Sequence, residues 1–229
     1  QASGFERLAE GERDPERTST YGTGEQIRQA LDLGATRIMV GLGGSATNDG
    51  GAGMLQALGA KLYGPDGGEL PPGGLALADL QRIDLSALDE RLRATEIIGA
   101  CDVDNPLTGP EGASVTFGPQ KGATPELIQR LDQALALYGT LLSQSSGIPV
   151  AQASGAGAAG GTGAAVLAMG GTLRPGGELI LEANGLAAAC QGADLVITGE
   201  GRIDGQTRRG KTPLAVAKVA RRHGVPVLA

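Results

Sequence analysis

Two loops in this sequence place hydroxyl, amide and carboxylate groups directly after apolar segments. The first reads GGSATNDGG (43–51) and lies between the apolar run 37–42, which predicts a buried strand, and a helical pattern over 51–58. Free N–H groups at a helix N-terminus bind anions, and glycines let a phosphate or carboxylate approach the backbone. We therefore expect the backbone of 43–51, with Ser45 and Asn48, to hold an anionic group. A glycine-rich connection without a ligand is the alternative.

The second loop follows an apolar strand over 96–101 and contains Asp102, Asp104 and Asn105 before Pro106. Carboxylates at the C-terminal end of a strand commonly hold Mg²⁺, which prefers oxygen ligands and keeps several waters. An Asp- and Asn-rich turn without a metal explains the same residues.

Two further segments are unusual in composition. GAGAAGGTGAA (155–165) is small enough to pack helix against helix or backbone against a ligand, and the sequence leaves both open. GEGRIDGQTRRGK (199–211) joins a strand over 194–198 to a helix that should begin with Thr212 as N-cap and Pro213. Ligands of open α/β sheets bind at that end of the strands. Lys211 lies beside the positive end of the helix, which is unfavourable unless an anion binds nearby.

Three long blocks resemble the type I glycerate kinases: GLGGSATNDGGAGMLQALGA (41–60), GACDVDNPLTGPEGASVTFGPQKGAT (99–124) and TGEGRIDGQTRRGKTPLAVAKVA (198–220). The match begins at about Thr20 and continues to the last residue. The resemblance implies transfer of the γ-phosphoryl of ATP to a hydroxyl of D-glycerate with Mg²⁺, in two α/β domains with the active site between them. Without it, composition and spacing reach only an anion-binding α/β enzyme.

The expected site follows from the motifs and the resemblance together. Candidates for binding the metal or accepting the substrate proton are Asp49, Asp102 and Asp204, and the roles among them stay open. Mg²⁺ is assigned to Asp102 and Asp104. The substrate or phosphate is assigned to Gly43, Gly44, Ser45, Asn48, Arg202 and Lys211. The nucleotide is assigned to Gly199, Glu200 and Gly201.

The family's usual opening strings, APDSFKxS and DGGEGT, do not occur here. The chain begins without methionine, its first ~19 residues are polar and without pattern, and it stops in an apolar strand over 225–229. We expect an internal fragment, with 1–185 the inserted α/β domain and 186–229 the start of the returning Rossmann-like nucleotide domain. A naturally short protein whose last strand lies on a sheet edge is the alternative.

Composition excludes several classes of function. A net charge of −6 argues against nucleic acid as a partner, which would need a basic face. No apolar run approaches membrane-spanning length. The two cysteines, Cys101 and Cys190, are expected buried and reduced in a cytoplasmic protein. A single histidine, His223, argues against zinc and against a Ser-His-Asp hydrolase, and GxxxxGK[ST] is absent. A homodimer stays open.

The remaining pattern predicts alternating strands and helices, and so an α/β fold with a largely parallel or mixed sheet. Helices are expected at 23–33, 51–58, 125–142, 162–169, 178–190 and 213–222, with a short one capped by Ser86. Strands are expected at 37–42, 60–62, 96–101, 194–198 and 225–229.

The sequence favours a glycerate kinase-like phosphotransferase. The alternatives are a non-catalytic anion-binding fragment and a kinase for another small hydroxy acid. Which hydroxyl is phosphorylated stays open.

Overall fold

The computed structural model describes residues 2–200 and 212–229 and divides the chain into two compact units, Gln1–Leu173 and Arg174–Ala229. Helices and short strands, paired both parallel and antiparallel, make up the described chain, which confirms the α/β class. The assignment of 1–185 to an inserted domain and 186–229 to a Rossmann-like domain stays a prediction.

The first unit contains a sheet with the order β1-β4-β5, formed by β1 (Arg37–Gly41), β4 (Glu96–Ala100) and β5 (Thr172–Arg174). β1 and β4 are parallel, with Gly41 opposite Ala100. β1 was expected to be buried, and this is wrong: in the described chain it forms the edge of the sheet, and Met39 is 51% exposed. Apolar composition alone does not distinguish an edge strand from a central one.

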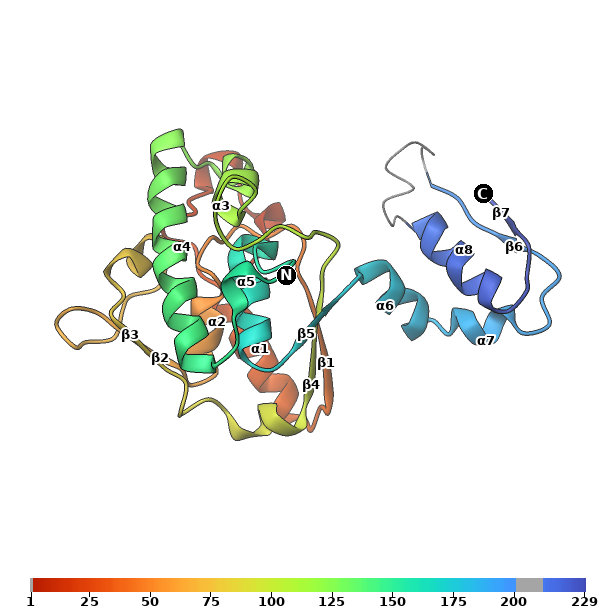
Figure 1. Cartoon of the computed structure of the whole chain (residues 1–229), viewed down its shortest axis with the longest axis horizontal. Helices are drawn as coiled ribbons and strands as arrows, with labels where there is room; N and C mark the ends of the chain where they lie inside the picture. Colours follow the sequence, from red (N-terminus) through yellow and green to blue (C-terminus); the bar gives the residue numbers. More distant parts are fainter. Residues whose placement is uncertain (1, 201–211) are drawn as a thin grey trace. The chain divides into compact units, whose positions relative to one another are not determined.

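Five helices accompany this sheet: α1 (Tyr21–Asp32), α2 (Ala52–Ala57), α3 (Ala113–Phe117), α4 (Pro125–Ser146) and α5 (Ala158–Ala168). α4 begins as predicted, because the Thr124 hydroxyl accepts the Leu127 N–H and Pro125 occupies the first helical position. α5 lies between α4 and the sheet (Figure 1). Their contact surfaces form the core, in which Tyr138 and Val166 are fully buried.

A hairpin and several short 3₁₀ helices complete the first unit. β2 (Lys61–Tyr63) pairs antiparallel with β3 (Arg82–Asp84), a strand that the sequence did not predict. The 3₁₀ helices are η1 (Phe5–Arg7), η2 (Glu10–Glu12), η3 (Leu75–Asp79), η4 (Glu90–Ala94), η5 (Pro119–Lys121) and η6 (Val150–Gln152).

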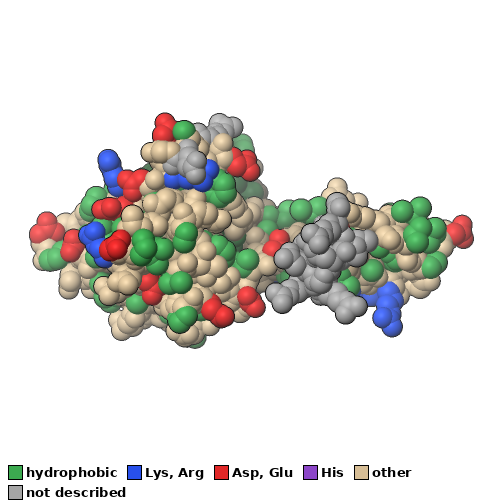
Figure 2. All heavy atoms as spheres, turned by 90° about the horizontal axis from the view of Figure 1, so that it is seen from above, with side chains coloured by type: hydrophobic (Ala, Val, Ile, Leu, Met, Phe, Trp, Pro, Cys, Tyr) green, Lys and Arg blue, Asp and Glu red, His purple; other side chains and the backbone are tan. Residues whose placement is uncertain are grey.

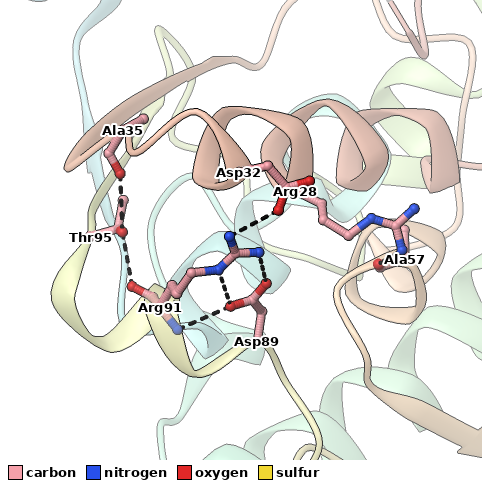
Figure 3. Close-up of polar contacts among 7 residues, drawn as sticks. All are labelled: Arg28, Asp32, Ala35, Ala57, Asp89, Arg91 and Thr95. Atoms are coloured by element: carbon pink, nitrogen blue, oxygen red, sulfur yellow. Dashed lines mark hydrogen bonds and ion pairs between the residues drawn. The ribbon is translucent and has the colours of Figure 1, made fainter.

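The short helix expected to be capped by Ser86 begins instead at Asp89. The Asp89 carboxylate accepts the Arg91 N–H at 3.0 Å and two guanidinium N–H groups of Arg91, at 2.9 and 2.6 Å (Figure 3). Arg91 also pairs with Asp32 of α1 at 2.9 Å. These bonds, the Arg91 side chain foremost, lower the pKa of Asp89. A carboxylate that caps η4 and binds an arginine has more partners than a serine hydroxyl, so the helix begins there.

The N-terminal segment, expected to be without pattern, holds the glycine loop. Ala46 N–H donates to the Ser3 carbonyl at 2.7 Å, and Phe5 N–H donates to the Gly44 carbonyl at 3.0 Å. The Thr18 hydroxyl donates to the Ala46 carbonyl at 2.8 Å. The N-terminal segment therefore fixes loop 43–51 by hydrogen bonds. A polar segment without hydrophobic periodicity gives no sign of such contacts in its sequence.

The second unit comprises α6 (Gly176–Ala183), α7 (Leu186–Cys190), β6 (Val196–Ile197), α8 (Thr212–Arg222) and β7 (Val227–Leu228). β6 and β7 pair in parallel, with α8 between them in the chain. The helical stretch expected over 178–190 is broken at Gly185, which has φ +68°. The hydrophobic core of the second unit is small and contains Cys190, Ala220 and Val225.

The charged side chains on the surface and the two cysteines were both considered from the composition. On the face drawn in Figure 2, the described Lys and Arg side chains are interspersed with Asp and Glu. Cys101 and Cys190 are buried and unpaired, as predicted. None of the helices in the described residues is both long and apolar enough to cross a membrane.

Candidate functional site

Three loops meet at the carboxyl ends of the strands in the first unit's sheet. β1 and β4 finish side by side, because Gly41 pairs with Ala100 and Leu42 N–H donates to the Ala100 carbonyl at 3.0 Å. Loops 43–51 and 101–106 therefore leave the sheet at the same end. Segment 155–163 lies against both: Gly50 N–H donates to the Gly160 carbonyl at 2.9 Å, and Gly157 N–H donates to the Asn105 carbonyl at 2.9 Å. Ligands of open α/β sheets bind at the carboxyl ends of the strands.

The glycines of 155–163 serve packing. A Cβ on Gly160 would lie 1.9 Å from the Thr47 carbonyl oxygen, and a Cβ on Gly157 would lie 2.2 Å from the Pro106 carbonyl oxygen. Gly160 and its neighbours Ala159 and Gly161 all have positive φ. At these positions the glycines pack against the backbone of the neighbouring loops, which is a third arrangement beside the helix packing and the ligand contact considered from the sequence.

Asp49 is fully buried, and its carboxylate is surrounded by donors. Oδ2 accepts the Thr20 N–H and hydroxyl, both at 2.8 Å, and the Gly53 N–H at 3.2 Å, while Oδ1 accepts the Gly51 N–H at 3.1 Å. Burial raises the pKa of Asp49, and these bonds oppose that rise. The carboxylate joins the start of α1 to the start of α2, which is the geometry of a positioning group.

Asp49 also changes how the loop can bind an anion. The N–H groups of Gly51 and Gly53 bond to its carboxylate, Ala52 N–H donates to its carbonyl, and Met54 N–H donates to the Thr20 hydroxyl. The expectation of free N–H groups at this helix N-terminus is therefore wrong, because the protein's own carboxylate takes the place of the anion. The part of the loop left for a ligand is 43–47.

A cavity of about 500 Å³ lies beside that part of the loop. Gly43, Ser45 and Thr47 line it, with Thr162 of α5. Thr47 is 1% exposed, and its hydroxyl has no hydrogen-bond partner in the described structure. Asn48 is not among the residues that line the cavity; its side-chain amide donates to the Ser114 hydroxyl at 2.9 Å.

Lys121 lies next to the same loop and is also 1% exposed. Its ammonium donates to the Thr47 carbonyl at 2.6 Å and to the Ser45 hydroxyl at 3.1 Å. Burial lowers the pKa of Lys121 to about 8, and the charge of Asp49 opposes this. A buried lysine without an anion in contact is costly, and perturbed groups of this kind gather at functional sites.

The carboxylates proposed for the metal follow β4. Asp102 and Asp104 are both exposed at the edge of the sheet from which loop 43–51 also leaves. Within residues 2–200 and 212–229, no group of three or more His, Cys, Asp or Glu side chains is close enough to hold a metal ion.

The remaining predicted residues belong to the second unit. Gly199 is exposed and Glu200 half-buried, just after β6. The predictions for Gly201, Arg202, Asp204 and Lys211 lie outside the described residues. The structure thus brings Gly43 and Ser45 to one cavity and gives Asn48 and Asp49 other partners.

Lys121 and Thr47 were missed as site residues. Lys121 lies in the turn sequence GPQKGA, where a lysine is expected to be solvated. The residue before it is held by a contact far away in sequence, because the Arg13 guanidinium donates to the Gln120 carbonyl at 3.1 Å across 107 residues. The signal in the sequence was the lysine's position inside a long distinctive block rather than any local pattern.

These features define an α/β protein with a candidate ligand site where the loops that follow two parallel strands meet. The chain belongs to the glycerate kinase family, because it matches the sequence model of that family over residues 1–229. The match therefore extends to the N-terminal segment, beyond the start expected near Thr20.

Individual relatives agree. The chain is 51% identical to glycerate kinase of Bacillus subtilis (strain 168) over 99% of its length, and 50% identical to glycerate 2-kinase of Escherichia coli (strain K12) over 99%. A crystal structure assigned to glycerate kinase 2 of Salmonella typhimurium LT2 superposes with a TM-score of 0.92 at 55% identity, over 99% of this chain. This confirms the expected glycerate kinase-like fold. The chain spans 60% of the two relatives and 61% of the Salmonella chain.

Proposed function

We propose that the protein containing this chain transfers the γ-phosphoryl of ATP to a hydroxyl of D-glycerate, giving phosphoglycerate and ADP. The observation that carries the proposal is the identity of about half of all positions to proteins named as glycerate kinases. The cavity beside loop 43–47 supports it, because a small hydroxy acid needs a compact site with a few polar groups.

In this proposal the glycine loop holds the substrate. Gly43, Gly44 and Ser45 bind the anionic part, and Asn48 supports the loop through Ser114. Of the three candidate bases, Asp49 is buried and bonded to four donors, so we assign it a positioning role. Asp102 and Asp204 remain the candidates for accepting the proton of the substrate hydroxyl.

Mg²⁺ suits the donor set after β4. Asp102 and Asp104 supply carboxylate oxygens, and magnesium sites of phosphoryl transfer need only one or two protein carboxylates besides the phosphates. When bound, the ion neutralises charge that develops on the transferred phosphoryl group. ATP is proposed to bind at Gly199, Glu200 and Gly201, and Arg202 and Lys211 are proposed to neutralise phosphate charge.

The activity is best tested in a chimera, because the chain spans 60% of its relatives. This chain would replace the matching segment of the Bacillus subtilis glycerate kinase, and ADP release would be measured with D-glycerate, for the chimera and for the 229-residue chain alone. We expect turnover by the chimera within about tenfold of the parent, since the two segments are 51% identical. A folded chimera without turnover would reject the proposal. ³¹P NMR of the product identifies the phosphorylated hydroxyl.

The same chimera separates the alternatives when glycerate binding is measured beside ADP release. A chimera that phosphorylates a different small hydroxy acid in preference to D-glycerate would indicate a kinase for another substrate. A chimera that binds glycerate without releasing ADP would indicate a non-catalytic anion-binding segment. A cytoplasmic location and a homodimer stay predictions and need fractionation and light scattering.

A further inference from the structure

Lys121 orients the hydroxyl group of Ser45. An ammonium has three donors and no acceptor, so in the 3.1 Å contact Ser45 Oγ accepts and its own proton must point elsewhere. Ser45 lines the cavity of about 500 Å³, and no other side-chain partner of its hydroxyl is found among the described residues. The Ser45 hydroxyl is therefore free to donate toward the cavity.

Thr47 offers a second donor at the same place. Its hydroxyl has no hydrogen-bond partner among the described residues although Thr47 is 1% exposed, and Thr47 also lines the cavity. A buried hydroxyl without a partner costs free energy, which a bound acceptor removes. The Thr47 carbonyl, in turn, is held by Lys121 at 2.6 Å.

We propose that Ser45 and Thr47 form a carboxylate subsite, with Lys121 as the positioning residue that orients the Ser45 hydroxyl, holds the Thr47 carbonyl and supplies a single positive charge from behind the loop. The subsite rests on the proposed function for its occupant, the carboxylate of the hydroxy acid. Its geometry is independent of the residues assigned to ATP and Mg²⁺.

The charge count favours a carboxylate over a phosphate. No charged side chain lines the cavity within the described part of the chain. Lys121, behind the loop, supplies at most one positive charge, part of which acts on Asp49. A carboxylate carries one negative charge, whereas a phosphate group at neutral pH carries up to about two. Apolar lining residues such as Ile27 and Leu42 further favour the less charged group.

Binding is measured on the 229-residue chain by ¹⁵N NMR, following the amides of Ser45 and Thr47 during titration with D-glycerate at pH 7. Glycerol is the probe without a carboxylate, and inorganic phosphate is the competing anion. We expect shifts with D-glycerate and little with glycerol. We expect Lys121→Met to weaken glycerate binding about tenfold or more, the range for a hydrogen-bonded charge. The control Lys61→Met removes an exposed lysine paired with Glu69 and should bind as the parent does.

A pH profile distinguishes the charge of Lys121 from a purely structural role. With a pKa of about 8, the free protein loses the cation above that pH, so glycerate affinity should fall about tenfold between pH 7 and pH 9. Lys121→Met should show no such fall. Asp49, whose charge acts on Lys121, is present in both proteins, and the Arg13 guanidinium that donates to the Gln120 carbonyl is unchanged. Burial raises the pKa of Tyr138 well above its ordinary value, so Tyr138 does not account for a change between pH 7 and pH 9.

The variants Ser45→Ala and Thr47→Val keep the lysine and test the subsite if Lys121→Met does not fold; each should weaken binding about threefold to tenfold. Glycerate binding that is unchanged in Lys121→Met, or in both hydroxyl variants, would overturn the subsite. The chimera assay would still test the proposed function independently. Binding of phosphate but not glycerate would overturn the carboxylate assignment. Lys121-dependent binding of L-lactate without glycerate binding would retain the subsite and reject the proposed substrate. No binding of any probe overturns the subsite.

Discussion

At the scale of single residues, three ionisable side chains near the sheet edge occupy different environments. Asp49 is buried among four donors, Lys121 is buried with no anion in contact among the described residues, and Asp102 is exposed at the end of β4. Each environment predicts a different result when the charge is removed.

Asp49→Asn should lower the free energy of unfolding by roughly 2–3 kcal/mol. An amide keeps one acceptor oxygen and places an NH₂ group where the carboxylate now accepts N–H and O–H donors from Thr20, Gly51 and Gly53. Urea denaturation measures the loss. The control Asp66→Asn changes an exposed turn whose single bond to Gly68 N–H an asparagine can keep. Equal stability of both variants would contradict the structural role of Asp49.

Lys121→Met should change the dependence of stability on pH. The pKa falls from 10.5 for an ordinary lysine to about 8 in the folded chain, so between these values the unfolded chain binds more protons. The parent therefore gains stability as pH rises from about 8 to 10.5, and carries the full penalty, of about 3 kcal/mol, below pH 8.

The variant removes that penalty and loses two hydrogen bonds, for a net gain of roughly 1–2 kcal/mol at pH 7. This gain should disappear toward pH 10. Urea denaturation at pH 7 and pH 9.5 tests both parts, with Lys61→Met as control. A variant that is less stable than the parent by the same amount at both pH values would contradict the predicted charge penalty.

Asp102→Asn tests whether Asp102 takes part in catalysis or in metal binding. In the active chimera we expect kcat to fall by about 10²-fold, the contribution typical of an acid–base group or a metal ligand. Folding should be unchanged, since the swap is nearly isosteric and the side chain is exposed. The matched variant Asp104→Asn shows whether the second carboxylate shares the role. Normal turnover of Asp102→Asn at saturating Mg²⁺ would make the residue structural.

At the scale of elements, the loops are held by backbone packing that side-chain patterns do not display. Gly160→Ala should destabilise the protein by about 3 kcal/mol or more, because the new Cβ would lie 1.9 Å from the Thr47 carbonyl oxygen at φ +66°. Gly170→Ala is the control, with φ +82° and nothing within 4 Å, so only the conformational cost of about 1–2 kcal/mol applies. Similar losses in both variants would contradict close packing of the two loops.

Sequence reasoning predicted the elements whose signals are local. α4 begins at Thr124 as its cap predicted, and β1 and β4 deliver their loops to one edge. It missed what depends on contacts far apart in sequence. Lys121 bonds to Thr47, which lies 74 positions away in sequence, and Asp49 bonds to Thr20, which lies 29 positions away. No local period encodes such contacts.

At the scale of the whole molecule, the chain has two units with separate cores. The large core contains residues of Gln1–Leu173 only, and so does the lining of the cavity. Six hydrophobic residues described in Arg174–Ala229 are buried: Leu179, Cys190, Ala215, Val216, Ala220 and Val225. Only Cys190, Ala220 and Val225 of these form one buried cluster. A chain of that length buries too little apolar surface for more than marginal stability.

We therefore expect the chain 1–173 to fold on its own, with a melting temperature within a few degrees of the large unit in the whole chain. The chain 174–229 should show little cooperative unfolding. Circular dichroism and ¹⁵N NMR on the two separate chains test this, and amides of 1–173 should keep their chemical shifts away from the cut. Because the cavity lies within 1–173, this shorter chain should also keep the glycerate affinity of the whole chain. A molten 1–173, or a cooperatively folded 174–229, would show that the stability of the molecule is not divided as its two cores predict.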